Sequence, residues 1–353
     1  MNTRTPVTLD GSYGEGGGQV LRTALALSLV TRRPVELRNV RAGRPRPGLA
    51  PQHLTAVWAA AEVGRARVEG DVKGSRELRF EPAGIFPEAY RWEIGTAGAT
   101  GLVLHTVAIP LALAPLESEA HVTGGTHVPW SPPFEHLARV WAPAVTALGF
   151  PVRAELRRAG FYPKGGGEIV AWLGPAGARG PLRAEERAPV REVRGVAAAA
   201  GLPDHVARRM AQRVRERLRR VGLEARVDER RLEAPSPGAY VFLELVPEAG
   251  PRLGASALGE RGKPAEAVAD EAADELLALL ASDATVDPHL ADQLLLPLAL
   301  VPEESVFTTA RITRHLTTNA WVIRQFLPQV EVEIEGAEGA AGRVRIRGTR
   351  EVT

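Results

Sequence analysis

The sequence predicts a mixed α/β or α+β fold built from internal repeats. Its main support is a pattern in which a strand, a glycine-rich turn and an apolar helix follow one another. The pattern occurs at residues 7–31 and 91–113, and a weaker copy lies at residues 306–327. Because strands and helices alternate and the pattern returns, we expect one supersecondary unit to be repeated along the chain.

Each copy of the pattern is justified by its local sequence. Glycines let the backbone turn tightly, and the apolar run after each turn has the length of a helix rather than a strand. In the weaker copy, Thr318 or Asn319 is expected to cap a helix that Pro328 ends. The first copy comprises residues 8–9, 11–18 and 19–29, the second residues 92–94, 95–101 and 102–113, and the third residues 308–314, 317–319 and 320–327.

Hydrophobic periodicity predicts the elements between these copies. Apolar residues at helical spacing predict helices at residues 52–63, 133–148, 204–221, 265–281 and 288–300. Short alternating segments predict strands at residues 36–40, 152–157 and 330–334.

The length of the chain and a change in its residue pattern predict the domain organisation. A chain of 353 residues exceeds what one hydrophobic core usually organises, so we expect two domains or a large domain with an insertion. In residues 183–281 the glycine-rich pattern lapses, and arginine dominates residues 208–220. We therefore expect a small α/β domain at residues 183–281, inserted into a large domain of residues 1–182 and 282–353. The arginine run is interpreted as a solvated helix face, with an RNA contact as the alternative.

Composition excludes several classes of protein. With 44% apolar and 24% charged residues, the chain is neither disordered nor fibrous. The absence of cysteine excludes disulfides, thiolate metal sites and cysteine nucleophiles, and it suits a reducing cytoplasm. The 44 basic and 42 acidic side chains give a net charge of +2, which by itself does not indicate a nucleic-acid partner.

No segment is expected to direct the chain to a membrane. Its start lacks a basic stretch followed by an apolar one, so it does not resemble a signal peptide. The longest apolar run, residues 102–116, is shorter than the roughly 20 residues of a transmembrane helix and contains prolines. We therefore expect a soluble cytoplasmic protein.

The glycine loop, residues 11–18, is the sharpest local signal for a binding site. Its glycines allow close approach of a ligand, and the N–H groups at the start of the next helix favour an anion. It is not a Walker motif, since the lysine is missing, nor a dinucleotide fingerprint, since Gln19 replaces the third glycine. Glu15 in such a loop indicates a metal between carboxylate and phosphate, with a tight turn and a solvated glutamate as the alternative.

The arginine loop, residues 41–46, is the second candidate. Arg41, Arg44 and Arg46 lie beside two prolines, and guanidinium groups on a rigid loop suit phosphate oxygens. Together with Arg22 they predict a site for a polyphosphate or an RNA end. The alternative is an exposed basic loop.

Histidine supplies a candidate nucleophile. None of the eight histidines has the spacing of a zinc site. His315 closes the predicted strand at residues 308–314, where flanking arginines would hold its imidazole neutral and nucleophilic. A structural histidine is the alternative. Residues 287–293 predict a capped helix start with His289 and Asp292 on one face, either as a pocket wall or as plain capping.

Together these residues resemble the RNA 3′-terminal phosphate cyclase family. The matching stretches follow in order over most of the chain and include the unusual Gly-Glu-Gly-Gly-Gly block of the glycine loop. They are residues 9–22, 41–49, 52–57, 160–167, 290–294 and 315–319. The resemblance implies a large domain of repeated βαβαββ-like units, related to the enolpyruvyl transferases, with a small α/β domain inserted late.

The resemblance also implies an activity. Family members use ATP to convert an RNA 3′-phosphate into a 2′,3′-cyclic phosphate, releasing AMP and pyrophosphate. Their route passes through a covalent histidine–AMP and an RNA-(3′)pp(5′)A intermediate. We therefore expect ATP as co-substrate, Mg²⁺ or Mn²⁺ as cofactor and RNA with a 3′-phosphate end as partner. The oligomeric state stays open, with a homodimer among the alternatives.

By position, the resemblance assigns thirteen residues to the site. His315 is the adenylated nucleophile and Glu15 the metal ligand. The phosphate-binding residues are Arg22, Arg41, Arg44, Gln52 and His53. The nucleotide-binding residues are His105, His289, Leu290, Ala291, Asp292 and Gln293. His105 replaces a common glutamine and His289 a common tyrosine, which we expect to alter nucleotide affinity rather than abolish activity.

Two alternatives come from other functional classes. A noncatalytic branch of the family, found in eukaryotic ribosome assembly, lacks the nucleophilic histidine, whereas His315, Glu15 and the arginine loop are present here. An enolpyruvyl transferase needs no histidine–AMP, and this glycine loop is not typical of one. Consumption of ATP separates these alternatives.

Overall fold

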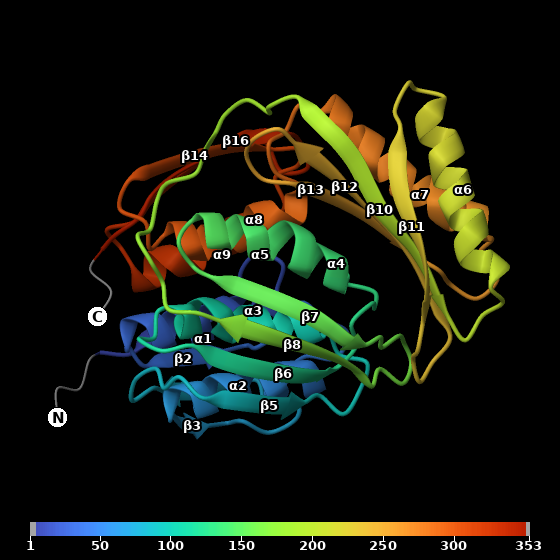
Figure 1. The fold of residues 1–353 in the computed structure, drawn as a ribbon. Coiled ribbons are helices and arrows are strands. Elements are labelled where there is room, and N and C mark those ends of the chain that lie inside the picture. Colours follow the sequence, from blue (N-terminus) through green and yellow to red (C-terminus); the bar gives the residue numbers. More distant parts are fainter. Residues whose placement is uncertain (1–4, 351–353) are drawn as a thin grey trace.

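The computed structural model describes residues 5–350, which form four mixed sheets of four strands each (Figure 1). Residues 1–4 and 351–353, the ends of the predicted large domain, lie outside the described residues. Three of the sheets share one topology, in which the first strand pairs in parallel with the second, and the fourth pairs antiparallel with both the second and the third. The predicted α/β fold of repeated units is confirmed.

Each of these three sheets belongs to one βαβαββ unit. The first unit contains β1 (Val7–Asp10), α1 (Gln19–Thr31), β2 (Val35–Arg38), α2 (Pro51–Gly64), β3 (Arg67–Glu69) and β4 (Leu78–Glu81). The second contains β5 (Ala89–Glu93), α3 (Thr100–Ala112), β6 (Ser118–Gly124), the helical run α4 (Phe134–His136), η1 (Leu137–Trp141) and α5 (Ala142–Ala147), then β7 (Val152–Arg158) and β8 (Gly167–Leu173). The third contains β9 (Arg183–Ala184), α8 (Pro288–Leu298), β14 (Glu304–Thr309), α9 (Arg314–Phe326), β15 (Glu331–Glu335) and β16 (Gly342–Arg347).

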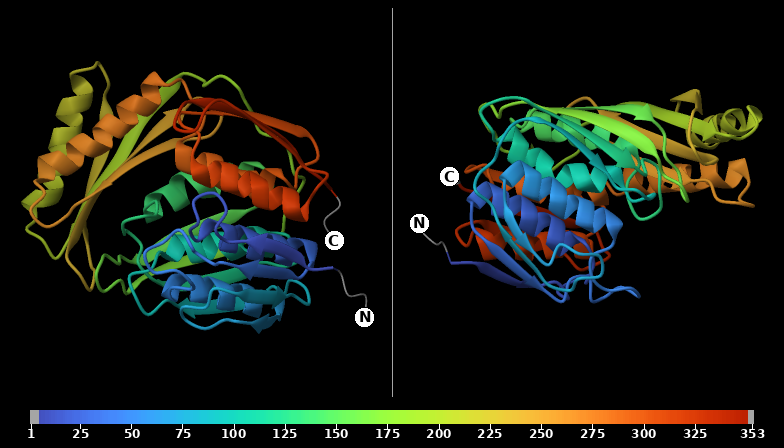
Figure 2. Two further views of the ribbon diagram at one scale, coloured as in Figure 1. Left: turned by 180° about the vertical axis from the view of Figure 1, so that it is seen from behind. Right: turned by 90° about the horizontal axis from the view of Figure 1, so that it is seen from below.

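Helices of the three units pack against one another between the sheets, as Figure 2 shows from two further sides. Helix α1 contacts α2, α3 and α9. Every residue of α1 is buried except Gln19 and Arg22, which are partly accessible. Among the described residues, no helix combines the length and apolar character needed to cross a bilayer.

The fourth sheet interrupts the third unit between β9 and α8. It is formed by β10 (Val190–Ala200), β11 (Ala225–Leu232), β12 (Gly238–Pro247) and β13 (Leu253–Leu258), and it carries α6 (His205–Arg219) and α7 (Ala265–Ala281). Successive side chains along each of its strands point to opposite faces of the sheet. Val241 and Leu243 pack with α6 and α7 in one core, whereas Tyr240 and Phe242 join the core of the repeat units. Figure 1 shows α6 and α7 on the face turned away from those units.

The boundaries of this insertion stay a prediction, although one pairing bears on them. Strand β9 pairs in parallel with β14, so Ala184 still belongs to the third sheet. The segment that forms the fourth sheet starts at Val190 and its last helix ends at Ala281.

The start of α9 differs from the prediction. The helix begins at Arg314, and its N-cap is Thr313, whose side chain accepts a hydrogen bond from the Leu316 N–H at 3.1 Å. The predicted caps, Thr318 and Asn319, are instead buried inside the helix, so that prediction is wrong. Thr313 is an equally good capping residue, and starting there adds a buried turn at Leu316. His315 therefore lies in the first turn of α9 and not at the end of a strand.

Candidate active site

A cavity of about 1060 Å³ lies where the helices of the repeat units face the inserted sheet. Eleven of the thirteen residues assigned by the resemblance line it: Glu15, Arg22, Arg41, Arg44, Gln52, His53, His105, His289, Asp292, Gln293 and His315. Leu290 and Ala291 do not, because they lie on the side of α8 that packs into the core and are fully buried. The structure thus gathers residues from distant parts of the chain around one space.

His315 faces the carboxylate of Glu15 in this cavity. Its Nε2 lies 3.5 Å from Glu15 Oε2, and the same oxygen accepts a hydrogen bond from Arg44 Nη2 at 2.6 Å. Desolvation lowers the pKa of His315, and the charges of Arg22 and Arg44 lower it as well, while Glu15 raises it. Because the net shift is downward from an ordinary value near 6.5, the imidazole is neutral at pH 7 and keeps a nucleophilic lone pair.

The glycine loop places Glu15 between His315 and Arg44. Gly14 and Gly16 have φ values of +65° and +57°, a conformation that side chains disfavour. A Cβ on Gly14 would clash with the hydroxyl of Thr318 on α9. On the other side, the Gly43 N–H of the arginine loop donates to Gly16 O at 3.0 Å. The loop is therefore held between α9 and the arginine loop, and glycine is needed for both close contacts.

Arg22 supplies a positive charge deep in the cavity. Its Nη2 donates to Gln19 Oε1 at 2.6 Å, and Gln19 Nε2 donates to Asn319 Oδ1 at 2.9 Å. These bonds fix the guanidinium group against α9. Burial lowers the pKa of Arg22 to about 10, so it stays protonated at neutral pH. A fixed and partly desolvated guanidinium group is well suited to bind phosphate oxygens.

His53 and Gln52 lie at the start of α2, beside this charge. Burial, together with the charges of Arg22, Arg41 and Arg44, lowers the pKa of His53 to about 2. Its imidazole is therefore neutral. Gln52 Oε1 accepts a hydrogen bond from the Ala99 N–H at 3.0 Å, which ties the second glycine-rich turn to α2.

Arg41 supports the shape of the arginine loop as well as its charge. Its Nη1 donates to the carbonyl oxygens of Arg46 and Gly48 at 3.1 and 2.6 Å. Desolvation lowers its pKa. The guanidinium group thus ties the two ends of the loop together while Arg44 reaches Glu15.

The opposite wall carries the residues assigned to the nucleotide. His105 packs on Trp141 with ring centroids 4.4 Å apart, and burial lowers its pKa to about 3. His289 lies edge-on to His136 at 5.8 Å, and desolvation within the cavity lowers its pKa. Gln293 Oε1 is buried without a hydrogen-bond partner. Flat rings beside an unpaired amide oxygen can stack on a base and read its edge.

Asp292 and the start of α8 complete this wall. Asp287 caps α8 as predicted, accepting from the N–H groups of His289 and Leu290 at 2.9 Å. Burial raises the pKa of Asp292 to about 8, although Arg22 acts in the opposite direction. At neutral pH the Asp292 carboxyl group therefore holds a proton and can donate a hydrogen bond.

Two parts of the wall were not predicted from the sequence. Ser256, Glu260 and Lys263 reach the cavity from the inserted sheet and the turn after it. The only sequence signal for them is the return of the glycine pattern near residues 259–262. The loop at residues 128–133 contributes Trp130, for which the sequence gives no periodicity or motif.

The residues present partly fit a metal ion. Among residues 5–350, no group of three or more histidine, aspartate or glutamate side chains is arranged to hold one. Glu15 lines the cavity, and its Oε2 lies 2.6 Å from Arg44 Nη2 of the arginine loop. One carboxylate, with phosphate oxygens and water, is the arrangement that Mg²⁺ uses in phosphoryl-transfer sites. Glu15 therefore fits a metal that arrives with a nucleotide.

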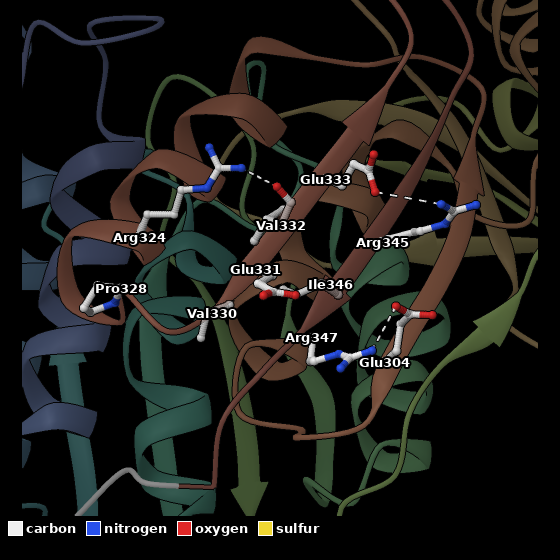
Figure 3. Close-up of a pocket in the computed structure, with 10 residues that line it drawn as sticks. All are labelled: Glu304, Arg324, Pro328, Val330, Glu331, Val332, Glu333, Arg345, Ile346 and Arg347. Atoms are coloured by element: carbon white, nitrogen blue, oxygen red, sulfur yellow. Dashed lines mark hydrogen bonds and ion pairs between the residues drawn. The ribbon is translucent and has the colours of Figure 1, made fainter.

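A second cavity, of about 470 Å³, lies over the third sheet and lacks these features (Figure 3). Two of its arginines lie near acidic residues, Arg345 at 3.8 Å from Glu333 and Arg347 at 3.5 Å from Glu304, and Arg324 donates a hydrogen bond to the backbone carbonyl of Val332. It contains no histidine. With no histidine, and with each of its three arginines already bonded or close to a partner, it does not match the chemistry of the first cavity.

Comparison with known proteins finds one family. The family model described as RNA 3′-terminal phosphate cyclase matches residues 13–334. The RNA 3′-terminal phosphate cyclase of Methylococcus capsulatus is 46% identical, and the match covers 98% of this chain and 97% of that protein. Those of Thermococcus onnurineus and Pyrobaculum neutrophilum are 45% and 44% identical, covering 97% and 94% of this chain and 99% and 95% of theirs.

Among solved structures, the enolpyruvyl transferase NikO from Streptomyces tendae aligns over 99% of this chain and 50% of that chain. The TM-score is 0.40 and the sequence identity is 10%. The family model spans most of the chain, and relatives above 40% identity extend over nearly its whole length. The chain therefore belongs to the RNA 3′-terminal phosphate cyclase family.

Proposed function

We propose that this chain uses ATP to convert RNA 3′-phosphate ends into 2′,3′-cyclic phosphates, with His315 as the nucleophile. The observation that carries the proposal is the position of His315 Nε2, 3.5 Å from Glu15, in a cavity that also contains Arg22 and Arg44. The pKa of His315 is lowered, so the ring is a neutral nucleophile. The surrounding guanidinium groups match the negative charge of a triphosphate.

In the first step, a ring nitrogen of His315 attacks the α-phosphorus of ATP. A phosphorus–nitrogen bond forms, the bond between the α-phosphorus and the bridging oxygen breaks, and pyrophosphate leaves. Arg22 and Arg44 would neutralise charge that grows on the phosphate oxygens. A Mg²⁺ or Mn²⁺ ion held by Glu15 would supply further neutralisation of the pyrophosphate.

In the second step, an oxygen of the RNA 3′-phosphate attacks the phosphorus of His315–AMP. The phosphorus–nitrogen bond breaks, which frees His315 and gives RNA-(3′)pp(5′)A. The adjacent 2′-oxygen then attacks the 3′-phosphorus, its proton passes to solvent, and AMP leaves. This last step is intramolecular, so the protein has mainly to position the ribose and neutralise charge.

The wall of His105, His289 and Gln293 would hold the adenine ring. Because Gln293 Oε1 is buried and unpaired, it can accept a hydrogen bond from the adenine amino group, which guanine lacks at that position. We expect ATP to be used more efficiently than GTP, and equal use of both would contradict an adenine-specific wall.

The experiment uses ATP labelled at the α-phosphate, with Mg²⁺ or Mn²⁺, on the native protein and on His315→Ala. Acid-labile label is expected on the native protein only, and RNA with a 3′-phosphate should remove it. His205→Ala is the matched control, because His205 is exposed on α6 and does not line the cavity. Label on His315→Ala would assign the nucleophile elsewhere, and a folded native protein that takes no label would support the noncatalytic branch.

A further inference from the structure

The loop at residues 128–133, here called the Trp130 loop, holds an indole ring in an unusual position. Trp130 is 99% exposed and lines the large cavity. Its φ is +70°, a conformation that is uncommon for a bulky residue. Nothing in the packing of the described residues requires an aromatic side chain here. A ring so fully open to the cavity is available to a ligand.

The backbone on both sides of Trp130 is restrained. Pro129, Pro132 and Pro133 lie within the loop and limit its conformational freedom. Just beyond its ends, the Phe134 N–H donates to Thr126 O at 3.1 Å. The loop is therefore a short closed segment that presents one exposed ring, which lowers the entropy cost of binding a ligand on it.

A buried hydrogen-bond network secures the two ends of the Trp130 loop. His127 Nε2 lies 2.8 Å from Glu135 Oε2, and the Tyr240 hydroxyl donates to the other Glu135 oxygen. His127 Nδ1 lies 2.8 Å from Thr126 Oγ1. The rings of His127 and Tyr240 stack with centroids 4.1 Å apart. Because Tyr240 belongs to β12, the network joins the inserted sheet to the loop.

We infer that Trp130 stacks on a base of the RNA substrate, and that the network of His127, Glu135 and Tyr240 holds it in position. This inference rests on the proposed function. A nucleobase suits the site, since every base has a flat face that stacks on an aromatic ring whatever its identity. An exposed aromatic ring can also bind a cation, but a cation suits this site less well than a base does, because the positively charged Arg22, Arg41 and Arg44 line the same cavity.

The RNA is a better source of this base than ATP. A cavity of about 1060 Å³ is at or above the upper limit of a site for one small molecule, about 1,000 Å³, so it has room for a second ligand. The rings assigned to adenine, His105 and His289, belong to α3 and α8, whereas Trp130 lies on a separate loop. A fully exposed ring on such a loop can be reached by a polymer that continues outside the cavity.

The test compares Trp130→Ala with the native protein on an RNA oligonucleotide ending in a 3′-phosphate. Stacking contributes about 1–3 kcal/mol per base, so the KM for RNA should rise by roughly five- to 150-fold. Adenylation of the protein by ATP alone should be unchanged. Trp58→Ala is the matched control, since Trp58 is half exposed on α2 and lies outside the cavity.

Abasic substrates decide which contact is lost. RNAs that lack the base at the terminal, penultimate or preceding nucleotide are assayed with both proteins. If Trp130 stacks on a base, removing that base makes native protein and Trp130→Ala equal. A rise in KM that persists on all three abasic RNAs would overturn the inference, as would an unchanged KM on intact RNA. Impaired adenylation by ATP alone would assign the ring to ATP instead.

Failure of the proposed function gives a different result. If the native protein takes no label from ATP, the proposed reaction is wrong. The stacking of Trp130 on a base is then tested by measuring RNA binding. Quenching of tryptophan fluorescence by the RNA should be smaller in Trp130→Ala than in Trp58→Ala. Equal quenching in both variants would overturn the stacking independently of catalysis.

Tyr240 acts through the loop and is a positioning residue. Tyr240→Phe removes the hydroxyl that donates to Glu135 but keeps the ring against His127. We expect a higher KM for RNA with kcat and adenylation unchanged, and no further rise when Trp130→Ala is added. A merely structural role would lower adenylation as well, and additive effects of the two substitutions would separate Tyr240 from the loop.

Discussion

Two regions of this molecule are rich in arginine, and they use it differently. In the cavity, Arg22, Arg41 and Arg44 surround the carboxylate of Glu15. On α6, by contrast, Arg209, Arg213 and Arg217 each pair with an acidic residue of α7, and these partners are Glu266, Asp270 and Asp274. The cavity therefore keeps an excess of positive charge, whereas on α6 the charge of these three arginines is neutralised.

Geometry explains the pairing on α6. The three arginines are four residues apart and so are their partners, which places both sets on facing stripes of two packed helices. Arg213 pairs with Asp270 through two hydrogen bonds, at 2.8 and 3.0 Å. A guanidinium group held in this way has few free N–H groups with which to bind a phosphate. The arrangement favours the interpretation of the arginine run as a helix face over its alternative, an RNA contact.

The largest expected effect is on adenylation. Arg22→Ala removes a fixed charge beside the reacting phosphate, and losses of a single such group are typically about 100- to 1,000-fold. Arg213→Ala should change the rate of labelling by less than about twofold, since its charge is already matched. The measurement is the rate at which labelled ATP modifies each protein.

Arg22→Lys refines this result. Lysine keeps the charge but loses the planar fork that Gln19 orients, so an intermediate rate is expected. If Arg22→Ala and Arg213→Ala were equally slow, the contrast between the two regions would not hold.

A smaller difference between the cavity and the α6–α7 pairs is expected in how the stability of the protein depends on pH. The pKa of Asp292 is about 8 in the folded protein and near 3.9 when unfolded, so the folded state binds more protons between these values. Stability contributed by the protonated carboxyl group is therefore lost as pH rises. Between pH 6.5 and 8 the loss is about 1.5 kcal/mol.

Chemical denaturation at several pH values measures this effect. Asp292→Asn, which cannot ionise, should remove that loss relative to the native protein. The cavity histidines oppose this loss up to about pH 7.5, because their pKa values are lowered in the folded state while an unfolded histidine, with a pKa near 6.5, is still partly protonated. Asp292→Asn retains these histidines, so the difference between the two proteins isolates the contribution of Asp292. Asp270→Asn on the α7 side should leave the native slope in place. A native slope retained in Asp292→Asn would show that another group titrates.

The contrast between the two regions also shows what the sequence could predict. The repeats and most helices follow from local signals such as the glycine loop and the apolar runs, whereas the full set of site residues was assigned through the family resemblance. The start of α9 does not, because Thr313 and Thr318 are both capping residue types and only packing selects between them. The pairing of Arg213 with Asp270 joins residues 57 positions apart, which no local pattern specifies.

The site residues that the sequence did not predict also depend on contacts between distant parts of the chain. Trp130 and Lys263 reach the cavity because the inserted sheet and the second unit meet there. Leu290 and Ala291 were assigned with their neighbours, although the turn of α8 points them into the core. A contiguous motif cannot distinguish the two sides of a helix when both sides are enclosed.

The smallest expected difference concerns the salt dependence of RNA binding. Arg44 is exposed at the cavity mouth, and removing its charge should weaken binding of a single-stranded RNA by up to about tenfold at low salt. Each lost phosphate contact reduces the slope of log affinity against log salt by about 0.7, so Arg44→Ala should show that reduction. Arg217→Ala should keep the native slope, because Arg217 already pairs with Asp274 and lies 3.5 Å from Asp270. Titration by fluorescence anisotropy at several salt concentrations measures both slopes. A reduced slope in Arg217→Ala would mean that RNA breaks the α6–α7 pairs and contacts the inserted sheet after all.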